Sequence, residues 1–588
     1  MIRSFRLSCI AFAIAILAAS SFAADKRPMK VEDMFKFKRV ASPRISPDGK
    51  FVAYQVTSVS LEENKSAADI FIAASDGKTP PKQLTDAKGK KDTNPRWSPD
   101  GKKILFESTR SGTSQIWVVS VEGGEPKQLI EISTGANNAI WSPDGMHIAF
   151  VSAVYPEFSE KPYAESDKLN KEKDEEIEKS PVKAKVFSKL FYRHWDEYVG
   201  DKRQHLFVIG ADGKSCRDVT PGDRDANPTS DTFSSGDDFT FTPDSKHLVF
   251  TAVPAKDEAW STNYDLCRVS ITNTSPKWDT LTAENKAGDS GPKFSPDGKK
   301  LAWRAQKKAG YEADKWDILV ADCKPDGTLA GKPFNVTAIE DISVNEFTWK
   351  DVDNFLFTGD KAGGAPLFAV QIGKKVGFDP LPGQMGSVTA AAGCYTYTNA
   401  AMNHPAQVFA FVSGPGRDEE LISIDHANDA LLDELDLPLP QEANVPIEGG
   451  VEMHMWILKP PGFDPKKKWP VAFLVHGGPQ GAWEDNWSYR WNPELWAAQG
   501  YVVVLPNPRG STGFGQKFVD EITGDWGGKC YRDLVAGLDY VEKLPYVDKD
   551  RIGAAGASFG GYMMDWFAVN EISKRFKCLI SHCSVWNF

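Results

Sequence analysis

Cysteine is scarce in this 588-residue sequence, and its copies are scattered. One of the 8 cysteines, Cys9, lies in an N-terminal segment of distinct composition. The others form no C-x-x-C pair and have no histidine at the spacing of a metal ligand. They are Cys216, Cys267, Cys323, Cys394, Cys530, Cys578 and Cys583. We therefore expect no metal site and no cofactor, and the odd number leaves at least one thiol outside any disulfide.

An excess of positive charge is also missing. The formal net charge is −11 at pH 7, and acidic and basic residues are dispersed along the chain. Nucleic-acid phosphates would be repelled by such a protein, so we expect no nucleic-acid partner.

Long apolar runs are absent except at the N-terminus, which reads "MIRSFRLSCIAFAIAILAASSFAADK". Two arginines precede an apolar run of about a dozen residues, and "SFA-AD" follows it, which is the pattern of a signal peptide. The run is too short to cross a bilayer. We predict a signal peptide over residues 1–23, a secreted or periplasmic location, and no membrane span.

A repeated turn motif occupies the first two thirds of the sequence. The copies are "PRISPDGKFVAY", "PRWSPDGKKILF", "AIWSPDGMHIAF", "FTFTPDSKHLVF" and "PKFSPDGKKLAW", with a worn copy at 347–357 and a degenerate one near 387–425. Proline fixes one corner of such a turn and glycine tolerates the positive φ of the next. Spacings of roughly 45–55 residues are typical of β-propeller blades. We predict a seven-bladed propeller over residues 24–435.

A charged insertion at about residues 155–190 interrupts this spacing and is predicted to form a solvated helical flap. The segment "LFYRHWDEY" follows it and contains Asp196 and Glu197. Two interpretations stay open for this segment, namely packing within a blade and contact with a ligand.

The last third has longer elements. The stretch "MHMWILKPPGF" reads as an edge strand, and buried apolar strands then alternate with helices up to the end. This alternation predicts an α/β domain with a mostly parallel sheet over residues 436–588.

Two motifs in this domain suggest acyl-transfer chemistry. Ser558 lies in a Gly-x-Ser-x-Gly frame between an apolar strand and a helix, and "HGGP" at 476–479 ends an earlier strand. The pentapeptide alone is a weak signal, but its place in a parallel sheet is that of a nucleophile elbow. The backbone N–H groups of Phe559 and of the Gly477–Gly478 turn could bind an oxyanion. His476 is interpreted as structural rather than as a base.

The motifs "HGGPQGAW", "NPRGSTGFG", "GDWGG" and "GASFGGYMM", behind a propeller, resemble the prolyl oligopeptidase family of serine peptidases, and most of all its dipeptidyl and acylaminoacyl peptidases. The resemblance implies a propeller that caps an α/β-hydrolase site and admits short peptides. It implies Ser558 as nucleophile, the N–H groups of Phe559 and Gly478 as oxyanion donors, and Val585 and Trp586 in the apolar substrate pocket.

The sequence departs from that family at two places. Phe559 stands where the family more often has tyrosine, which keeps the backbone donor and removes a hydroxyl. Cys583 and Ser584 stand where the relatives usually carry Asp-Gly.

A catalytic acid and base are missing after the serine. In this fold the order is serine, acid, histidine, yet only Asp565 and His582 follow Ser558. Asp565 lies inside the elbow helix, and His582 ends a neighbouring strand. We therefore expect a C-terminally truncated hydrolase domain whose acid and base would follow Phe588, which would leave this chain inactive.

The sequence predicts a serine exopeptidase that releases dipeptides from the N-terminus of short peptides through an acyl-enzyme on Ser558. Asp196 and Glu197 are the candidates for holding the substrate amine. The alternatives are an acylaminoacyl peptidase or esterase, and a non-catalytic propeller that binds peptides. The sequence does not determine the oligomeric state.

Overall fold

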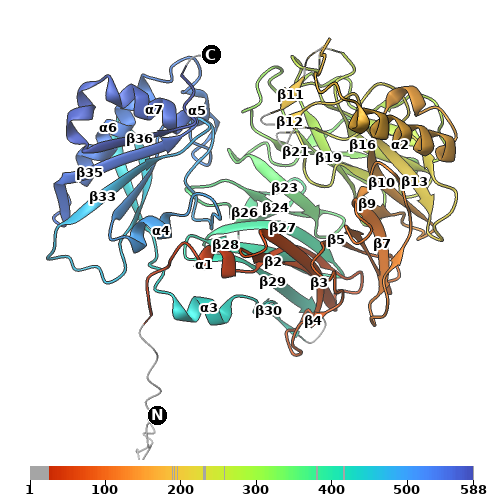
Figure 1. Ribbon diagram of the computed structural model, residues 1–588, viewed down its shortest axis with the longest axis horizontal. Coiled ribbons are helices and arrows are strands. Elements are labelled where there is room, and N and C mark those ends of the chain that lie inside the picture. Colours follow the sequence, from red (N-terminus) through yellow and green to blue (C-terminus); the bar gives the residue numbers. More distant parts are fainter. Residues whose placement is uncertain are drawn as a thin grey trace, which may run out of the picture.

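A computed structural model describes residues 26–586 except 189, 191, 195–196, 230–232, 257, 379–381 and 415–416. Figure 1 shows a propeller beside a smaller, helix-covered sheet that contains the C-terminal residues. The predicted signal peptide lies outside the described residues and stays a prediction.

Seven four-stranded antiparallel sheets form the propeller within the described residues, which confirms the predicted blade number. The first three blades are β1(Arg39–Ile45), β2(Phe51–Ser60), β3(Lys65–Ala74), β4(Lys82–Gln83); β5(Asp92–Trp97), β6(Lys103–Ser108), β7(Gln115–Ser120), β8(Lys127–Gln128); and β9(Asn137–Trp141), β10(His147–Val154), β13(Arg203–Gly210), β14(Arg217–Asp218). The next two are β15(Phe239–Phe241), β16(His247–Ala252), β17(Asp265–Ser270), β18(Asp279–Thr280); and β19(Asp289–Phe294), β20(Lys300–Ala305), β21(Asp317–Asp322), β22(Phe334–Asn335). The last two are β23(Val344–Trp349), β24(Asn354–Gly359), β25(Leu367–Gln371), β26(Val376–Phe378); and β27(Gln384–Ala391), β28(Cys394–Ala401), β29(His404–Gly414), β30(Arg417–Ser423).

The repeated turn motif joins the first two strands of a blade. In the first copy the Ser46 hydroxyl donates to Asp48 at 2.7 Å and accepts the N–H of Phe51 at 2.9 Å. Ser98 with Asp100 and Ser295 with Asp297 repeat the contact at 2.6 and 2.7 Å. The turn is therefore closed by its own side chains, which explains why this motif recurs in the first five blades.

A bulge recurs in the innermost strands. Ser42, Asn94, Asn138 and Ser387 have φ between 53° and 57°, and pairing registers shift beside them. A bulge turns the strand locally and re-aims its side chains.

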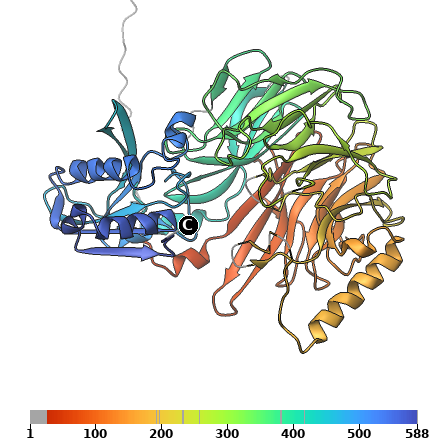
Figure 2. The same cartoon turned by 90° about the horizontal axis from the view of Figure 1, so that it is seen from above.

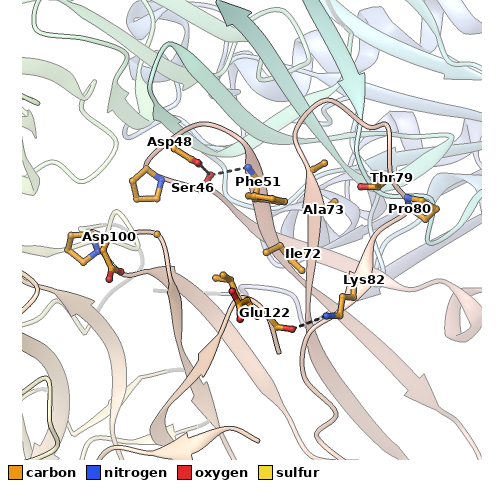
Figure 3. Close-up of a pocket in the computed structure, with 15 residues that line it drawn as sticks. Ser46, Asp48, Phe51, Ile72, Ala73, Thr79, Pro80, Lys82, Asp100 and Glu122 are labelled. Carbon is orange, nitrogen blue, oxygen red and sulfur yellow. Dashed lines mark hydrogen bonds between the residues drawn. The ribbon is translucent and has the colours of Figure 1, made fainter. Parts of the chain in front are cut away.

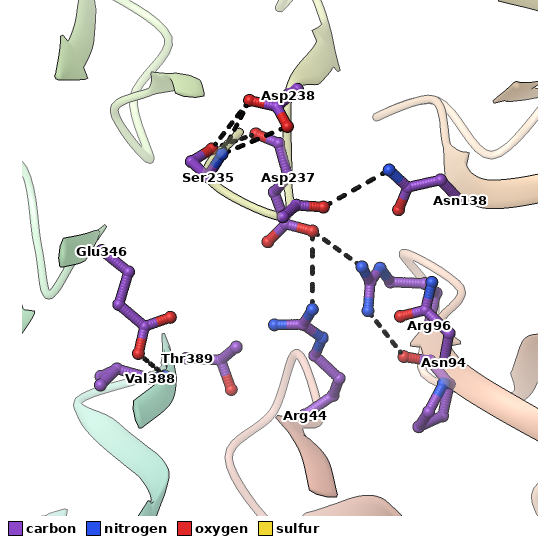
Figure 4. A network of polar contacts seen from close by, with 12 residues as sticks. Arg44, Asn94, Arg96, Asn138, Ser235, Asp237, Asp238, Glu346, Val388 and Thr389 are labelled. Carbon is purple, nitrogen blue, oxygen red and sulfur yellow. Dashed lines mark hydrogen bonds and ion pairs between the residues drawn. The ribbon is translucent and has the colours of Figure 1, made fainter. Parts of the chain in front are cut away.

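Three cations near these bulges converge on one carboxylate. Arg96, Arg44 and Lys293 lie 2.7, 3.5 and 3.6 Å from Asp237, so blades 1, 2, 4 and 5 meet at this residue. Figure 4 shows the two arginines pointing toward Asp237. Burial would raise the pKa of Asp237, but the three cations hold it well below its ordinary value.

The charged insertion contains the predicted helix and a short helical turn, and two short paired strands follow it. These are η1(Pro156–Phe158), α2(Tyr163–Lys179), β11(Arg193–His194) and β12(Glu197–Tyr198). Asn170 of α2 is buried and accepts the N–H of Tyr155 at 2.8 Å. The helix lies on the side of the propeller away from the hydrolase domain (Figure 2). Asp196 lies outside the described residues, and the side chain of Glu197 is not described, so their assignment to the substrate amine stays a prediction.

A six-stranded sheet forms the hydrolase domain, in the order β31-β32-β34-β33-β35-β36. Its strands are β31(Gln441–Ile447), β32(Val451–Leu458), β33(Trp469–Val475), β34(Val502–Asn507), β35(Val547–Ala557) and β36(Cys578–His582). The four strands from β34 to β36 in that order pair in parallel, which confirms a mostly parallel sheet. The prediction of an edge strand at "MHMWILKPPGF" was wrong, because β32 is paired on both sides and the edge is β31.

Helices cover both faces of this sheet (Figure 2). They are α4(Pro493–Ala498), α5(Gln516–Asp520), α6(Lys529–Val541), α7(Phe559–Ala568) and η2(Glu571–Arg575). The buried face of α6 includes Leu534, Leu538 and Val541. A Cβ at Gly537 would lie 2.8 Å from the Met453 side chain, so glycine allows close packing of helix on sheet.

The two domains meet at the segment that joins them, and the first described residues of the chain also pack there. Helices α1(Asp33–Lys36) and α3(Asp429–Glu434) flank a core in which Met34 and Phe37 pack with Leu435 and Trp487. The last propeller strand ends at Ser423 and β31 begins at Gln441, and the predicted boundary at 435/436 lies between them.

The part of the chain that the structure describes contains no helix long and apolar enough to cross a bilayer. The seven cysteines outside the N-terminal segment are all free thiols.

Candidate active site

Ser558 stands at the junction of β35 and α7 with φ 57° and ψ −118°. This conformation is rare for a residue with a side chain, and it is the sharp strand-to-helix turn of a nucleophile elbow. The Ser558 N–H donates to the carbonyl of His582 at 3.0 Å, and its own carbonyl accepts the N–H of Tyr562 at 3.0 Å. Strand β36 and helix α7 thus both hold Ser558 in place through backbone hydrogen bonds.

The glycines around Ser558 are required by space. A Cβ at Gly556 would lie 2.3 Å from the carbonyl oxygen of Gly560, and one at Gly560 would lie 2.2 Å from that of Val475. A Cβ at Gly561 would lie 2.8 Å from the carbonyl oxygen of His582. The helix can therefore approach the sheet only with glycine at these positions.

The predicted oxyanion donors lie close to the serine. A Cβ at Gly477 would lie 3.5 Å from the Cβ of Ser558, so the "HGGP" turn is in contact with the elbow. Phe559 is the first residue of α7, where the backbone N–H has no acceptor within the helix. Its side chain is fully buried and packs edge-on against Trp526, with ring centroids 5.0 Å apart. The side chain of Phe559 is therefore out of reach of a substrate, and its proposed role depends on its backbone N–H alone.

Ser558 and Gly478 line one cavity of about 620 Å³ between the two domains. Gln516 joins the domains at its wall, since its N–H donates to Asp341 at 3.0 Å and its amide to the carbonyl of Ala313 at 2.9 Å. The Ala362 N–H donates to the carbonyl of Gly513 at 2.9 Å. Loops of blades 5 and 6 thus contact the hydrolase domain beside the cavity of Ser558.

The propeller wall of this cavity is acidic. Its lining carboxylates are Glu312, Asp314, Asp341 and Asp360. Lys315 also lines the cavity, but its ammonium lies 2.9 Å from Asp317 and is paired there. A cationic group of a substrate would be favoured in this space.

One of these carboxylates has an unusual partner. Asp360 accepts a hydrogen bond from the Asn345 amide at 2.7 Å, and its carboxyl group is also hydrogen-bonded to Glu484 of the hydrolase domain. Burial, and then the charge of Asp360, raise the pKa of Glu484 well above its ordinary value. Sequence reasoning missed both residues, because no motif links positions so far apart.

Asp565 and His582 have partners other than Ser558. The His582 ring packs against Trp491 with centroids 5.2 Å apart, and Asp565 accepts a hydrogen bond from the hydroxyl of Ser584. Within the described residues neither side chain is hydrogen-bonded to Ser558.

Val585 is half-buried and Trp586 is 79% exposed. Neither is among the described residues that line the cavity of Ser558, and their assignment to the substrate pocket stays a prediction. The described His, Cys, Asp and Glu side chains form no group of three that could hold a metal ion.

A second cavity, of about 690 Å³, lies between blades 1 and 2 (Figure 3). Its carboxylates include Asp48 and Asp100, which the Ser46 and Ser98 hydroxyls already bind within their turns. Those hydrogen bonds lower the pKa of both carboxyl groups. This cavity therefore presents turn residues rather than a reactive group, and we assign it no role.

Comparison with known proteins identifies the relatives of this arrangement. A dipeptidyl-peptidase 5 of Porphyromonas gingivalis is 31% identical over 565 residues, which are 93% of this chain and 78% of the relative. Residues 487–588 match the model of the prolyl oligopeptidase family, and residues 27–219 match the TolB beta propeller domain. The chain belongs to the prolyl oligopeptidase family. The predicted resemblance is thereby confirmed, and the protein is a serine peptidase by family.

Further relatives agree with this assignment. A dipeptidyl-peptidase 5 of Arthroderma otae is 30% identical and is matched over 96% of this chain and 79% of its own length. The solved structure of a Pyrococcus horikoshii acylaminoacyl peptidase superposes with a TM-score of 0.73 at 20% identity, over 95% of this chain and 79% of that one. That likeness shows the shared fold of propeller and hydrolase.

Proposed function

We propose that this protein is a serine exopeptidase that releases dipeptides from the N-terminus of short peptides. The observation that carries the proposal is the cavity between the domains, which has Ser558 on one wall and four carboxylate residues on the other. A free N-terminal ammonium would be attracted to that acidic wall, whereas an acylated terminus carries no charge there. The name of the curated relatives supports the same activity.

The proposed reaction proceeds by nucleophilic catalysis. The Ser558 hydroxyl attacks the carbonyl of the second substrate residue, while a base accepts its proton and returns it to the leaving amine. The N–H groups of Phe559 and Gly478 bind the oxygen as it becomes negative. Water then cleaves the acyl-enzyme and frees the dipeptide.

The acid and base of this reaction are still predictions. This chain spans 78% of the length of its P. gingivalis relative, and we predict an acid followed by a histidine beyond Phe588. Sequencing the natural gene through the codon for Phe588 tests this. A stop codon at that point would leave Ser558 without partners and would favour a peptide-binding role.

Hydrolysis of paired substrates tests the proposal itself. The protein expressed from its natural gene is given dipeptidyl-aminomethylcoumarins with a free and with an acetylated N-terminus, and acetyl-aminoacyl analogues. We expect cleavage of the free-amine dipeptides, and loss of cleavage in Ser558→Ala. Preference for acetylated substrates would instead indicate an acylaminoacyl peptidase, and no cleavage of any of them would contradict a peptidase.

We also propose export of this protein, on the N-terminal pattern alone. N-terminal sequencing of the mature protein from the producing cell is expected to begin at Ala24. A retained Met1 would contradict export by cleavage.

A further inference from the structure

Residues 181–188 follow helix α2 in the charged insertion and have no regular secondary structure. All eight are exposed, and they form the longest run of consecutive exposed residues in the part of the chain that the structure describes. Val186 is 93% exposed. Within that same part, the backbone of residues 184–188 makes no hydrogen bond. The main chain of this segment is therefore open to a partner.

Only side chains hold the segment in place. The Lys183 ammonium donates to the carbonyl of Glu178 at 2.9 Å, in an exposed contact. The Lys185 ammonium lies 5.3 Å from the ring of Tyr198, and the Phe187 ring stacks on that tyrosine with centroids 5.4 Å apart. A cation over an exposed ring contributes only about 0.5–1 kcal/mol. Another protein can therefore take up either lysine side chain at little cost.

The sequence of the segment alternates in polarity. Val182, Ala184 and Val186 are apolar, and Lys183 and Lys185 stand between them. When such a segment pairs as a strand, its successive side chains point to opposite sides, so both lysines would lie on one side. An extended backbone with unpaired N–H and C=O groups can pair with the edge strand of another protein. The segment is thus suited to present lysine to a partner that binds extended chains.

A trypsin-type serine peptidase fits both features. The carboxylate in its primary specificity pocket binds the lysine side chain that precedes the cleaved bond. Proteolytic nicking also requires a backbone that is exposed and free of hydrogen bonds. Ala184 follows Lys183 and Val186 follows Lys185, so each bond has an N–H group on its leaving side.

Two lysines of α2 show why exposure alone is not sufficient. The side chain of Lys168 is 73% exposed, but this residue lies in the middle of α2. Lys179 is the last residue of the helix, and its ammonium lies 2.9 Å from Glu175. A helical backbone is hydrogen-bonded to itself and must open locally before a peptidase can cleave it. Cleavage is therefore expected after Lys183 or Lys185 and not within α2.

Side-chain contacts join the parts of the chain on either side of the segment. The Tyr155 hydroxyl donates to Asp174 of α2 at 3.0 Å, and Lys202, which follows the segment, donates to the same carboxylate at 2.7 Å. Asp167 of α2 accepts the N–H of Ser133 at 2.7 Å. Helix α2 would therefore stay attached to the propeller after a break in the segment.

The central strand pair of blade 3 also spans the segment. Strand β10 precedes it and β13 follows it, and they pair antiparallel from His147 with Gly210 to Val154 with Arg203. No backbone group of the segment takes part in this pairing. A break between β10 and β13 therefore leaves the blade held together by hydrogen bonds between the two resulting chains.

We infer that residues 181–188 form a processing site, at which a trypsin-type serine peptidase converts this protein into a folded two-chain form. The peptide bond that breaks is Lys183–Ala184 or Lys185–Val186. Water supplies the hydroxyl group of the new lysine carboxyl and the hydrogen of the new α-amino group. The inference does not depend on the proposed function, because it concerns the insertion as a substrate of another enzyme.

Limited digestion of the folded protein, expressed from its natural gene, tests the site. Trypsin is the probe, and mass spectrometry of the earliest products locates the first cut, which we expect after Lys183 or Lys185. A synthetic peptide of residues 179–188 gives the rate for an unfolded chain. We expect the folded protein to be cleaved at a rate within about tenfold of the peptide, because no unfolding step precedes the cut. A first cut elsewhere, or a much slower one, would overturn the inference.

Variants without the susceptible bonds provide the matched comparison. Ala184→Pro combined with Val186→Pro keeps both lysines and removes the N–H after each. We expect the first cut to slow by about tenfold or more, because cleavage then depends on local opening elsewhere. Lys183→Gln combined with Lys185→Gln should protect equally without changing the backbone. Lys168→Gln is the control and should be cleaved like the wild type. Unchanged cleavage in both double variants would contradict the site.

The two-chain form is tested on the digested protein. Size-exclusion chromatography is expected to give one peak at the volume of the intact protein, with both chains in it. The melting temperature should fall by no more than about 4 °C, which corresponds to about 1 kcal/mol for a large domain. Separation of the chains, or a larger fall, would show that the intact segment is needed for the fold and would overturn the inference.

Discussion

At the scale of single residues, carboxyl groups with few exposed atoms lie both at the candidate site and in the interior near it. Asp360 lines the cavity of Ser558 and interacts with Glu484 across the domain boundary. An ammonium group could bind beside these two residues, because carboxylate oxygens accept its hydrogen bonds. The pair is therefore a second candidate for the amine site.

Asp360→Asn tests this role. Removing a charge that contacts the substrate amine should raise KM for free-amine dipeptidyl substrates by about tenfold, which corresponds to about 1.4 kcal/mol. KM for acetylated substrates should stay the same. Asp353→Asn serves as the control, because Asp353 lies in an exposed turn of the same blade. Equal changes in KM for both kinds of substrate would contradict an amine site.

A second prediction at this scale concerns Glu494 and the pH dependence of stability. Glu494 is 1% exposed, its Oε1 has no hydrogen-bond partner among the described residues, and burial raises its pKa from 4.5 to about 9. A raised pKa means that the folded state holds a proton which the unfolded state releases. The free energy of unfolding should therefore fall by about 1.4 kcal/mol per pH unit from this group as the pH rises through that window.

Glu494→Gln should remove this pH dependence and make the protein more stable than the wild type at pH 8. Urea denaturation at several pH values from 5 to 9 measures it. Parallel stability curves for wild type and variant would show that Glu494 is not protonated in the folded protein.

At the scale of elements, the elbow depends on how closely α7 approaches the sheet. Glycines set the distance between α7 and the sheet, since a Cβ at Gly560 would lie 2.2 Å from the carbonyl oxygen of Val475 and collide with it. A backbone carbonyl at the end of β33 cannot move without disturbing the neighbouring "HGGP" turn. The same glycine is therefore required for the packing of α7 on the sheet and for the geometry of the turn at Ser558.

Gly560→Ala should destabilise the protein by about 3 kcal/mol, at the upper end of what overpacking costs, and should abolish hydrolysis. Thermal denaturation and the free-amine assay measure the two effects. Gly331→Ala is the matched control, because a Cβ there would meet no atom within 4 Å. Wild-type stability in Gly560→Ala would show that α7 can shift without cost.

At the scale of the whole molecule, the first and last blades of the propeller do not share a strand. Each of its seven sheets in the described residues is built from strands of one continuous region, so no strand from one end of the chain completes a blade at the other. The contacts of Asp237 with Arg44, Arg96 and Lys293 cross the axis instead and link the first blades to later ones.

Asp237→Asn should leave three cations facing one another and lower the stability of the propeller by about 1–3 kcal/mol, less than for a fully buried ion pair because the Asp237 side chain is 30% exposed. Because the pKa of Asp237 is depressed, the wild type should also lose this stability as the pH falls below about 4. Thermal denaturation at pH 7 and at low pH measures both effects. Equal melting temperatures for wild type and variant at pH 7 would show that the axial contacts are dispensable.

The sequence by itself determined the features that rest on neighbouring residues. The blade repeat is encoded in Ser-Pro-Asp-Gly turns that close on their own side chains, and the elbow in glycines within two residues of Ser558. Even the wrong edge strand followed from local pattern, because each strand was considered alone and the pairing of β31 with β32 lies outside the pattern of either strand.

Only the tertiary structure decided the walls of the cavity and the axis of the propeller. Asp360 and Glu484 come from different domains, and Asp237 meets cations from three other blades. Turns and elbows are fixed by backbone geometry over a few residues. Charges from distant positions acquire partners only when the ring of blades closes and the hydrolase domain packs against it.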